Sequence, residues 1–127
     1  MAETRKAIGN GSERAFCALA KARGWWCHGF AYKFAGQPCD AVALKGDRSL
    51  LVDVKHCESP RFALSRIEPN QRTCFEYAAS CGVEGCGFAV WFSLPKKWRW
   101  LPWAKAKEML QDGESSVLWG ELGELPL

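Results

Sequence analysis

One apolar run with two charged residues inside it constrains this chain more than any other feature. Residues 49–57 alternate in character with a period of two, which is the period of side chains on a β-strand. On this period the even positions from Leu50 to Val54 share one face, and Leu51, Asp53 and Lys55 share the other. The sequence therefore predicts a strand from which an acid-x-lysine pair emerges on a single face.

Helical and strand patterns alternate along the rest of the chain, and the glycines Gly24, Gly82 and Gly113 are expected to end its helices. We predict helices at residues 12–23, with Ser12 as N-cap, at 69–81 and at 102–112. We predict strands at residues 26–34, 40–44, 49–57, 87–93 and 98–101, an edge strand at 116–119, turns at 36–38 and 45–48, and a loop at 58–69. The segment at 87–93 is apolar on both faces and is expected at the sheet centre. This order indicates an α/β domain built around one mixed sheet.

The chain has 127 residues, which predicts a single domain. We divide it into a flexible, polar N-terminus at residues 1–9 and a folded domain at residues 10–127. Residues 1–107 hold all 17 basic side chains and nine of the 14 acidic ones, a net charge of +8, whereas residues 108–127 hold five acids and no base. Such a basic body is typical of proteins that bind a phosphate backbone. The alternative is an ordinary solvated surface of mixed charge.

The seven cysteines are odd in number, and the sequence shows neither a signal peptide nor a stretch approaching a membrane span. We therefore expect reduced thiols, a cytoplasmic or nucleoid-associated location, and no membrane partner. Zinc binding by Cys74, Cys81 and Cys86 is an alternative, although the chain contains no CxxC pair. Small buried thiols on a helix face explain these positions equally simply.

The acidic residues near the central strand predict a metal site. Asp40 opens the strand that pairs with the one carrying Asp53, so the two carboxylates are expected within ~5–8 Å of each other. Oxygen ligands favour Mg²⁺, with Mn²⁺ as a second choice, and such an ion can activate water against a phosphodiester. Lys55 is expected to position that water or to offset charge on phosphorus. Taken singly, Asp40 could cap a turn, Glu13 could favour a helix N-terminus, and Asp53 with Lys55 could face solvent.

In this order and on these elements, the residues resemble the PD-(D/E)XK nucleases, and most closely the Holliday junction resolvases of the RecU type and, more distantly, the archaeal type. The likeness is carried by residues 10–14, 39–46, 51–55, 61–71, 87–92 and 100–102. It implies a restriction-endonuclease-like domain with helices flanking a mixed sheet. It also implies a homodimer that cuts four-way DNA junctions with paired symmetric nicks, using Mg²⁺. Under this resemblance the metal ligands are Glu13, Asp40 and Asp53, the catalytic lysine is Lys55, and Gln71 assists in the active site.

The sequence departs from this pattern at three places. Cys39 stands between Pro38 and Asp40 where the family has Pro-Asp, Asn70 replaces the histidine before Gln71, and the chain has no room for the RecU protrusion. Two other functions stay open: a flap, single-strand or restriction-type endonuclease on the same fold, and a DNA-binding module that does not cut. The small size also suits a phage-encoded enzyme.

Basic residues outside the metal site are candidate contacts to the DNA backbone. Trp98 and Trp100 interleave with three of them, which suits a phosphate-binding surface with base stacking, but both rings could instead belong to the core or to a dimer contact. The seven tryptophans suggest a large aromatic core, an interface, or both. The candidate DNA contacts are Arg14, Arg61, Arg66, Arg72, Lys96, Lys97 and Arg99.

Overall fold

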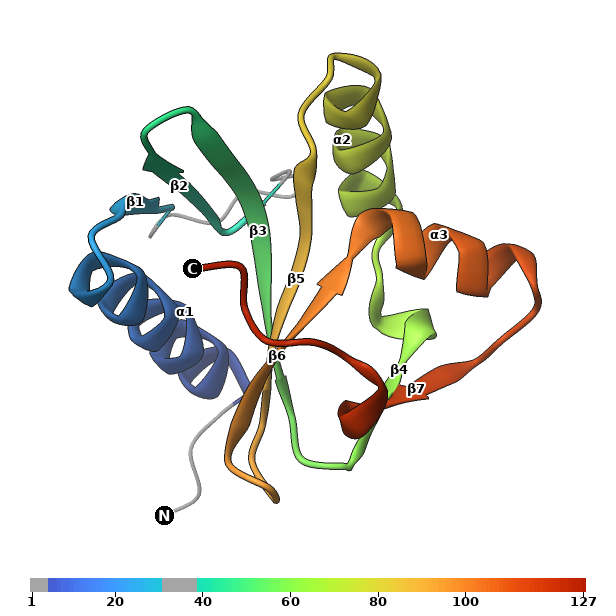
Figure 1. Cartoon of the computed structure of the whole chain (residues 1–127). Coiled ribbons are helices and arrows are strands. Elements are labelled where there is room, and N and C mark those ends of the chain that lie inside the picture. The colour runs from blue at the N-terminus through green and yellow to red at the C-terminus, as the bar shows by residue number, and fades with distance from the viewer. Residues whose placement is uncertain (1–4, 31–38) are drawn as a thin grey trace.

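The computed structural model describes residues 5–30 and 39–127, with side chains from residue 11 onward. Its strands form a five-stranded sheet in the order β1-β2-β3-β5-β6 and a small two-stranded sheet of β4 and β7 (Figure 1). The helices are α1 (Arg5–Ala22), α2 (Pro69–Ser80) and α3 (Trp103–Gln111), with 3-10 turns at Leu64–Arg66 and Trp119–Glu121. The strands are β1 (Trp26–Gly29), β2 (Ala41–Lys45), β3 (Arg48–Cys57), β4 (Arg61–Ala63), β5 (Gly85–Phe92), β6 (Lys97–Pro102) and β7 (Ser116–Leu118).

The large sheet is mixed, as the sequence predicts. β1, β2 and β3 are antiparallel neighbours, β3 and β5 run parallel, and β5 and β6 are antiparallel. The predicted hairpin turn between β2 and β3 is confirmed: Lys45 pairs with Arg48, and Gly46 has a φ of 61°. A left-handed φ of this kind is readily accessible to glycine. The α/β fold with helices flanking one mixed sheet is therefore confirmed.

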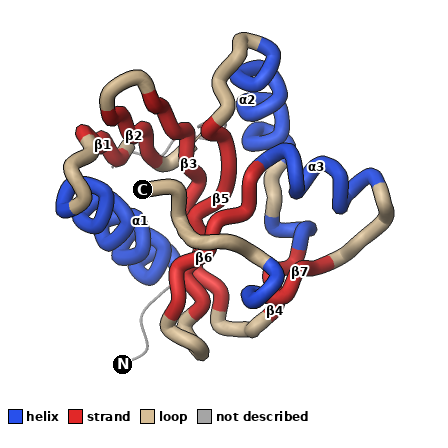
Figure 2. Tube along the Cα trace, viewed as in Figure 1, coloured by secondary structure: helices blue, strands red, loops and turns tan. Residues whose placement is uncertain are grey.

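Helices cover the two faces of the sheet unequally. α1 lies against one face, and α2 and α3 pack on the other (Figures 1 and 2). The alternation of β3 sends Val52 and Val54 to the first face and Leu51 to the second. We call the first group of buried residues the α1-side cluster: Phe16, Ala20, Trp25, Cys27, Ala41, Ala43, Leu50, Val52, Val54, Ala89 and Leu125.

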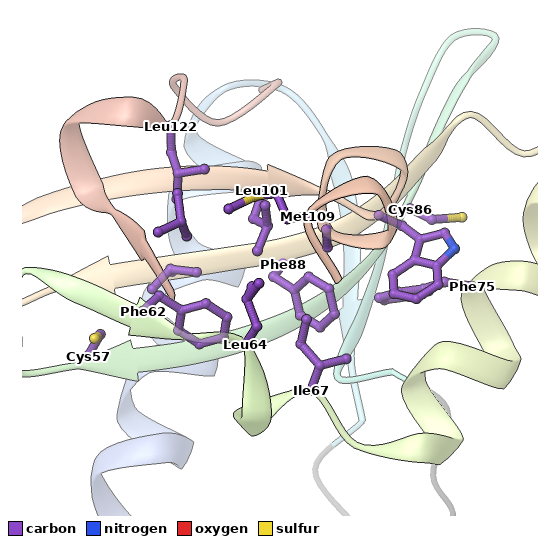
Figure 3. Close-up of a cluster of buried hydrophobic side chains, with 14 of the residues drawn as sticks. Cys57, Phe62, Leu64, Ile67, Phe75, Cys86, Phe88, Leu101, Met109 and Leu122 are labelled. Atoms are coloured by element: carbon purple, nitrogen blue, oxygen red, sulfur yellow. The ribbon is translucent and has the colours of Figure 1, made fainter. Parts of the chain in front are cut away.

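The second group, the α2-side cluster, is larger and is built mainly from aromatic and branched side chains. Phe88 lies in it, with Phe75 edge-on at 5.3 Å between ring centroids. Figure 3 shows its centre, formed by Cys57, Phe62, Leu64, Ile67, Phe75, Cys86, Phe88, Leu101, Met109 and Leu122.

β5 is the most enclosed strand, as its apolar sequence predicts. Ala89 points into the α1-side cluster, while Phe88 and Val90 point into the α2-side cluster. A Cβ atom at Gly87 would lie 2.6 Å from the carbonyl oxygen of Leu101 on β6. Glycine at this position thus lets two strands approach more closely than any side chain would permit.

Four sequence-based predictions are wrong in detail. α1 begins at Arg5, so Ser12 lies inside the helix and does not cap it. The segment predicted as a loop at residues 58–69 contains β4 and a 3-10 turn, because β4 pairs with β7 far along the chain. β7 therefore edges a separate sheet and not the large one. β5 begins at Gly85, two residues before the strand predicted at 87–93.

Other predictions fall outside the described residues. They concern residues 1–4 of the predicted N-terminus, residues 31–34 of the second predicted element and the turn at 36–38. Within the described part of the chain, no helix is both long enough and apolar enough to cross a membrane.

Candidate active site

Two buried aspartates meet where β2 begins beside the middle of β3. The backbone of Asp40 extends the β2 ladder, since its N–H donates to the Val52 carbonyl at 2.9 Å and its carbonyl accepts from Phe30 N–H at 2.9 Å. Its side chain turns onto β3, where Oδ2 accepts from the Val54 N–H at 2.8 Å. Asp40 and Asp53 are 7% and 3% exposed. Burial to this degree is costly for carboxylates, so these two positions need a specific explanation.

Lys55 lies two residues beyond Asp53 on the same face of β3. Its Nζ is 3.0 Å from Asp53 Oδ2, and the lysine side chain is 13% exposed. That Oδ2 is buried, and the Lys55 ammonium is the positive charge beside it. The structure therefore confirms that the acid-x-lysine pair emerges together, but in a buried place and not toward solvent.

Gln71 reaches the same site from the first turn of α2. Its Oε1 accepts from the backbone N–H of Glu68 at 2.9 Å, which completes a capping box at the start of the helix. Its Nε2 donates to Asp53 Oδ1 at 2.9 Å. One amide thus fixes both the end of a helix and the orientation of a buried carboxylate. The sequence places Gln71 in the first turn, and only the fold brings it to Asp53.

The environment of Asp53 makes its charged form unfavourable. Burial is the largest effect and raises the pKa of Asp53 to about 7; the neighbouring Asp40 adds to the rise and Lys55 opposes it. A carboxyl that is buried beside another acid is a common mark of a functional site. Additional positive charge near Asp53 would favour its charged form.

Glu13 lies on α1, which packs on the opposite face of the sheet. It is half-buried and follows Ser12, whose hydroxyl is 3.4 Å from His56 Nδ1 on β3. This contact places Ser12 and Glu13 on α1 near His56, the residue that follows Lys55 on β3. Within the described residues no three His, Cys, Asp or Glu side chains are grouped to hold a metal ion. Metal ligation by Glu13 stays a prediction. The described cysteines likewise form no group of three that could hold zinc.

A buried thiol borders the site and was not assigned a role from the sequence. Cys39 is 5% exposed, and burial raises its pKa to about 12, with Cys74, Asp40 and Asp53 adding to the rise. In the sequence, only its position directly before Asp40 indicates that Cys39 lies near the site. As a neutral thiol it fills space beside the carboxylates without contributing charge.

The predicted DNA contacts lie on several elements. Arg14, Arg61, Arg66, Arg72, Lys96 and Lys97 are exposed. Two of them are held by neighbours: Arg61 Nε donates to Ser116 Oγ at 2.9 Å, and Arg66 lies 5.4 Å over the Phe62 ring. Arg99 is half-buried, 5.2 Å over Trp119, and its Nε is buried with no hydrogen-bond partner among the described residues. The exposed six remain candidates, and Arg99 is the least accessible.

The tryptophans of β6 belong to the core. Trp98 packs edge-on against Phe16 at 6.1 Å and near Trp91 at 5.5 Å, and both Trp98 and Trp100 pack against the α1-side cluster. Of the two alternatives for these rings, the structure favours core packing over a stacking surface.

Comparison with known proteins rests on structure alone, because the sequence matches no family model and no curated protein. The chain is similar to Hjc, a Holliday junction resolvase from the archaeal hyperthermophile Archaeoglobus fulgidus, with a TM-score of 0.68 and 20% identity over 93% of this chain and 92% of that one. The chain has a Holliday junction resolvase-like fold. It is also similar to a nuclease from a fusellovirus, with a TM-score of 0.52 and 11% identity over 98% of this chain and 90% of that one. The resolvase-like fold therefore spans nearly the whole of each of these chains.

Proposed function

We propose that this protein is a divalent-metal-dependent DNA endonuclease that cuts branched DNA, with the four-way junction as its preferred substrate. The observation that carries the proposal is the buried set of Asp40, Asp53, Lys55 and Gln71. Hydrogen bonds or an ion pair hold each member in place. Burial and the neighbouring Asp40 make the charged form of Asp53 unfavourable, so a cation bound there would stabilise it. The likeness of fold to a junction resolvase and to a viral nuclease supports the choice of DNA.

The donor set suits Mg²⁺ or Mn²⁺. Mg²⁺ is commonly held by one or two carboxylates, with water and substrate phosphate completing its coordination. Asp40 and Asp53 supply two such carboxylates, and both are buried. When bound, the cation would neutralise both acids, polarise the phosphate and lower the pKa of an attacking water. Glu13 is proposed as a further ligand on the strength of the family resemblance.

The chain's own residues then have separable tasks. The Val54 N–H holds Asp40, and the Gln71 amide holds Asp53, so neither carboxylate has to reorganise during the reaction. Lys55 is held 3.0 Å from Asp53. With Asp53 engaged as a metal ligand, the Lys55 ammonium would be available to stabilise negative charge that develops on the phosphate oxygens.

Two finer statements belong to the same proposal. Paired symmetric nicks require two active sites, so we propose that the protein acts as a homodimer. The exposed arginines and lysines outside the site, Arg14, Arg61, Arg66, Arg72, Lys96 and Lys97, would contact the DNA backbone.

The test is cleavage of a labelled four-way junction beside linear duplex, flap and single strand of matched sequence, with Mg²⁺ and with EDTA. Wild type is compared with Asp53→Asn, which keeps the shape of the side chain and removes its charge. We expect symmetric nicks in the junction that need Mg²⁺ and disappear in the variant. Equal cutting of the duplex would remove the junction preference, and cutting of a flap or single strand would move the substrate. DNA binding without any cutting, unchanged in Asp53→Asn, would leave a non-cleaving binding module.

A further inference from the structure

The strand at the edge of the large sheet carries a row of aromatic side chains that no part of the proposed mechanism uses. Trp26, His28 and Phe30 alternate along and just beyond β1 on the face away from α1, because the intervening Cys27 is buried in the α1-side cluster. The Trp26 and His28 rings are stacked, with centroids 6.2 Å apart and planes at 16°. His28 and Phe30 meet edge-on at 5.2 Å. We call these three residues the aromatic row.

The aromatic row begins at the candidate active site. Phe30 donates its backbone N–H to the Asp40 carbonyl at 2.9 Å, so it lies directly beside the first carboxylate. The register pairs His28 with Val42 and Val42 with Leu51. Leu51 shares its face of β3 with Asp53 and Lys55. The row and the site thus occupy one continuous face of the sheet.

Exposure rises with distance from the site. Phe30 is half-buried against the α2-side cluster, His28 is exposed, and Trp26 is 61% exposed. Leu44, the strand partner of Trp26, is 42% exposed. A tryptophan this open to solvent contributes little to the core. Much of its ring surface, apart from the part stacked on His28, is accessible to a flat ligand.

The segments around the outer end of the row carry more basic than acidic side chains, but two of these bases are engaged on the α1 side of the sheet: Lys45 Nζ donates to the Arg23 carbonyl at 2.9 Å, and Arg48 lies 4.8 Å over the ring of Trp25. The exposed charged residues in the adjoining segments 21–28 and 44–49 are four bases and one acid. They are Lys21, Arg23, Lys45, Arg48 and Asp47. Aromatic rings flanked by basic side chains are the usual means of holding single-stranded nucleic acid, because every base has a face that stacks.

A second copy of the chain fits this surface less well. Stable interfaces bury about 800 Å² on each partner, while a tryptophan buries at most about 250 Å². Among the described residues the other large exposed apolar side chains are Tyr77 on α2 and Leu94 between β5 and β6, outside this pair of strands. The row is also polar in part, through His28.

We propose that the aromatic row binds unpaired nucleobases of the DNA strand next to the phosphate cut at Asp40 and Asp53. This inference rests on the proposed function and specifies its substrate: branched DNA whose bases near the cut are unpaired. Trp26 and His28 would stack on the bases.

The test is direct binding in EDTA, which separates it from cleavage. The probes are a labelled oligothymidylate, a blunt duplex of equal length and a four-way junction. Trp26→Leu removes the ring and keeps apolar bulk, Trp26→Phe keeps a ring, and Leu44→Ala alters the neighbouring apolar surface alone. Circular dichroism and the thermal midpoint establish that each variant is folded.

We expect Trp26→Leu to weaken oligothymidylate binding by about 5- to 100-fold, the loss of one stacked base. Trp26→Phe should retain most of that affinity, and Leu44→Ala all of it, with duplex binding unchanged throughout. Equal affinity of Trp26→Leu and wild type for the single strand would overturn the proposal. So would an equal loss on duplex, or a dimer that becomes monomeric by light scattering in Trp26→Leu. Single-strand binding that depends on Trp26 in a protein that never cuts would keep this inference and reject the nuclease.

Discussion

The two faces of strand β3 differ in polarity: one is apolar, and the other carries charged side chains. On one face the side chains of Leu50, Val52 and Val54 enter the apolar α1-side cluster. On the other face Asp53 is buried beside Asp40, with the half-buried Lys55 paired to it, next to the α2-side cluster. The same ten-residue strand therefore stabilises the fold on one side and carries charges at an energetic cost on the other. This contrast separates variants that should reduce stability from variants that should reduce activity.

The largest expected effect is on stability and should be equal on the two sides of the sheet. Phe16 and Phe88 are both 0% exposed, one in each cluster. Truncating either to alanine leaves a cavity, so each variant should lose about 3–5 kcal/mol of unfolding free energy. Urea denaturation measures this loss. A change below about 1 kcal/mol at Phe16 would mean that the α1 side contributes little to the core.

The next effect should separate the faces by activity. Lys55→Ala removes the only ammonium at the site and should slow cleavage by about 10²- to 10³-fold with small change in stability. Val54→Ala, one residue away on the other face, should lower stability by about 1–3 kcal/mol and leave the cleavage rate of the folded protein unchanged. Single-turnover cleavage and urea denaturation of both variants make the comparison. Slow cleavage in folded Val54→Ala would show that the faces are coupled.

The charge on the site face should make stability depend on pH. The pKa of Asp53 is raised to about 7 from 3.8, so the native state holds this proton more tightly than the unfolded chain. The resulting stabilisation is present below pH 3.8 and is lost as pH rises to about 7. Asp53→Asn, which has no charge to bury, should therefore be more stable than wild type at pH 8 in EDTA, by about 1–3 kcal/mol.

Added Mg²⁺ should reverse this order at pH 8. A cation that binds the two carboxylates stabilises the folded wild type and not the variant, and the effect grows with the logarithm of its concentration. Thermal midpoints at pH 5 and pH 8, with EDTA or Mg²⁺, test both statements. Wild type that is more stable than Asp53→Asn in EDTA at pH 8 would contradict the buried-charge argument.

The smallest effect concerns the amide that joins α2 to the site. Gln71→Ala loses both the capping contact to Glu68 and the contact to Asp53. We expect about 1 kcal/mol lower stability and about 10- to 100-fold slower cleavage. Gln71→Glu can still accept from Glu68 but places a second acid against Asp53, so it should restore helix capping without restoring activity. Recovery of both in Gln71→Glu would assign Gln71 a purely structural role.

The sequence by itself determined a strand at residues 49–57, the faces of its side chains, the central place of β5 and the α/β class. These features follow from local alternation and from runs of apolar residues, which depend only on neighbours in the chain. The candidate residues Asp53 and Lys55 came from the same alternation, since two residues apart on a strand means one face.

Only the tertiary structure decided what those residues contact. Whether Lys55 is buried, whether Gln71 reaches Asp53, and that Val54 N–H holds Asp40 all depend on how α2 and β2 pack against β3. The pairing of β4 with β7 was invisible locally because its partners lie far apart in the chain. The aromatic row on β1 likewise has meaning only once the register sets Phe30 beside Asp40. Periodicity fixes which way a side chain points, whereas its neighbours across the sheet are set by long-range packing, which no local pattern encodes.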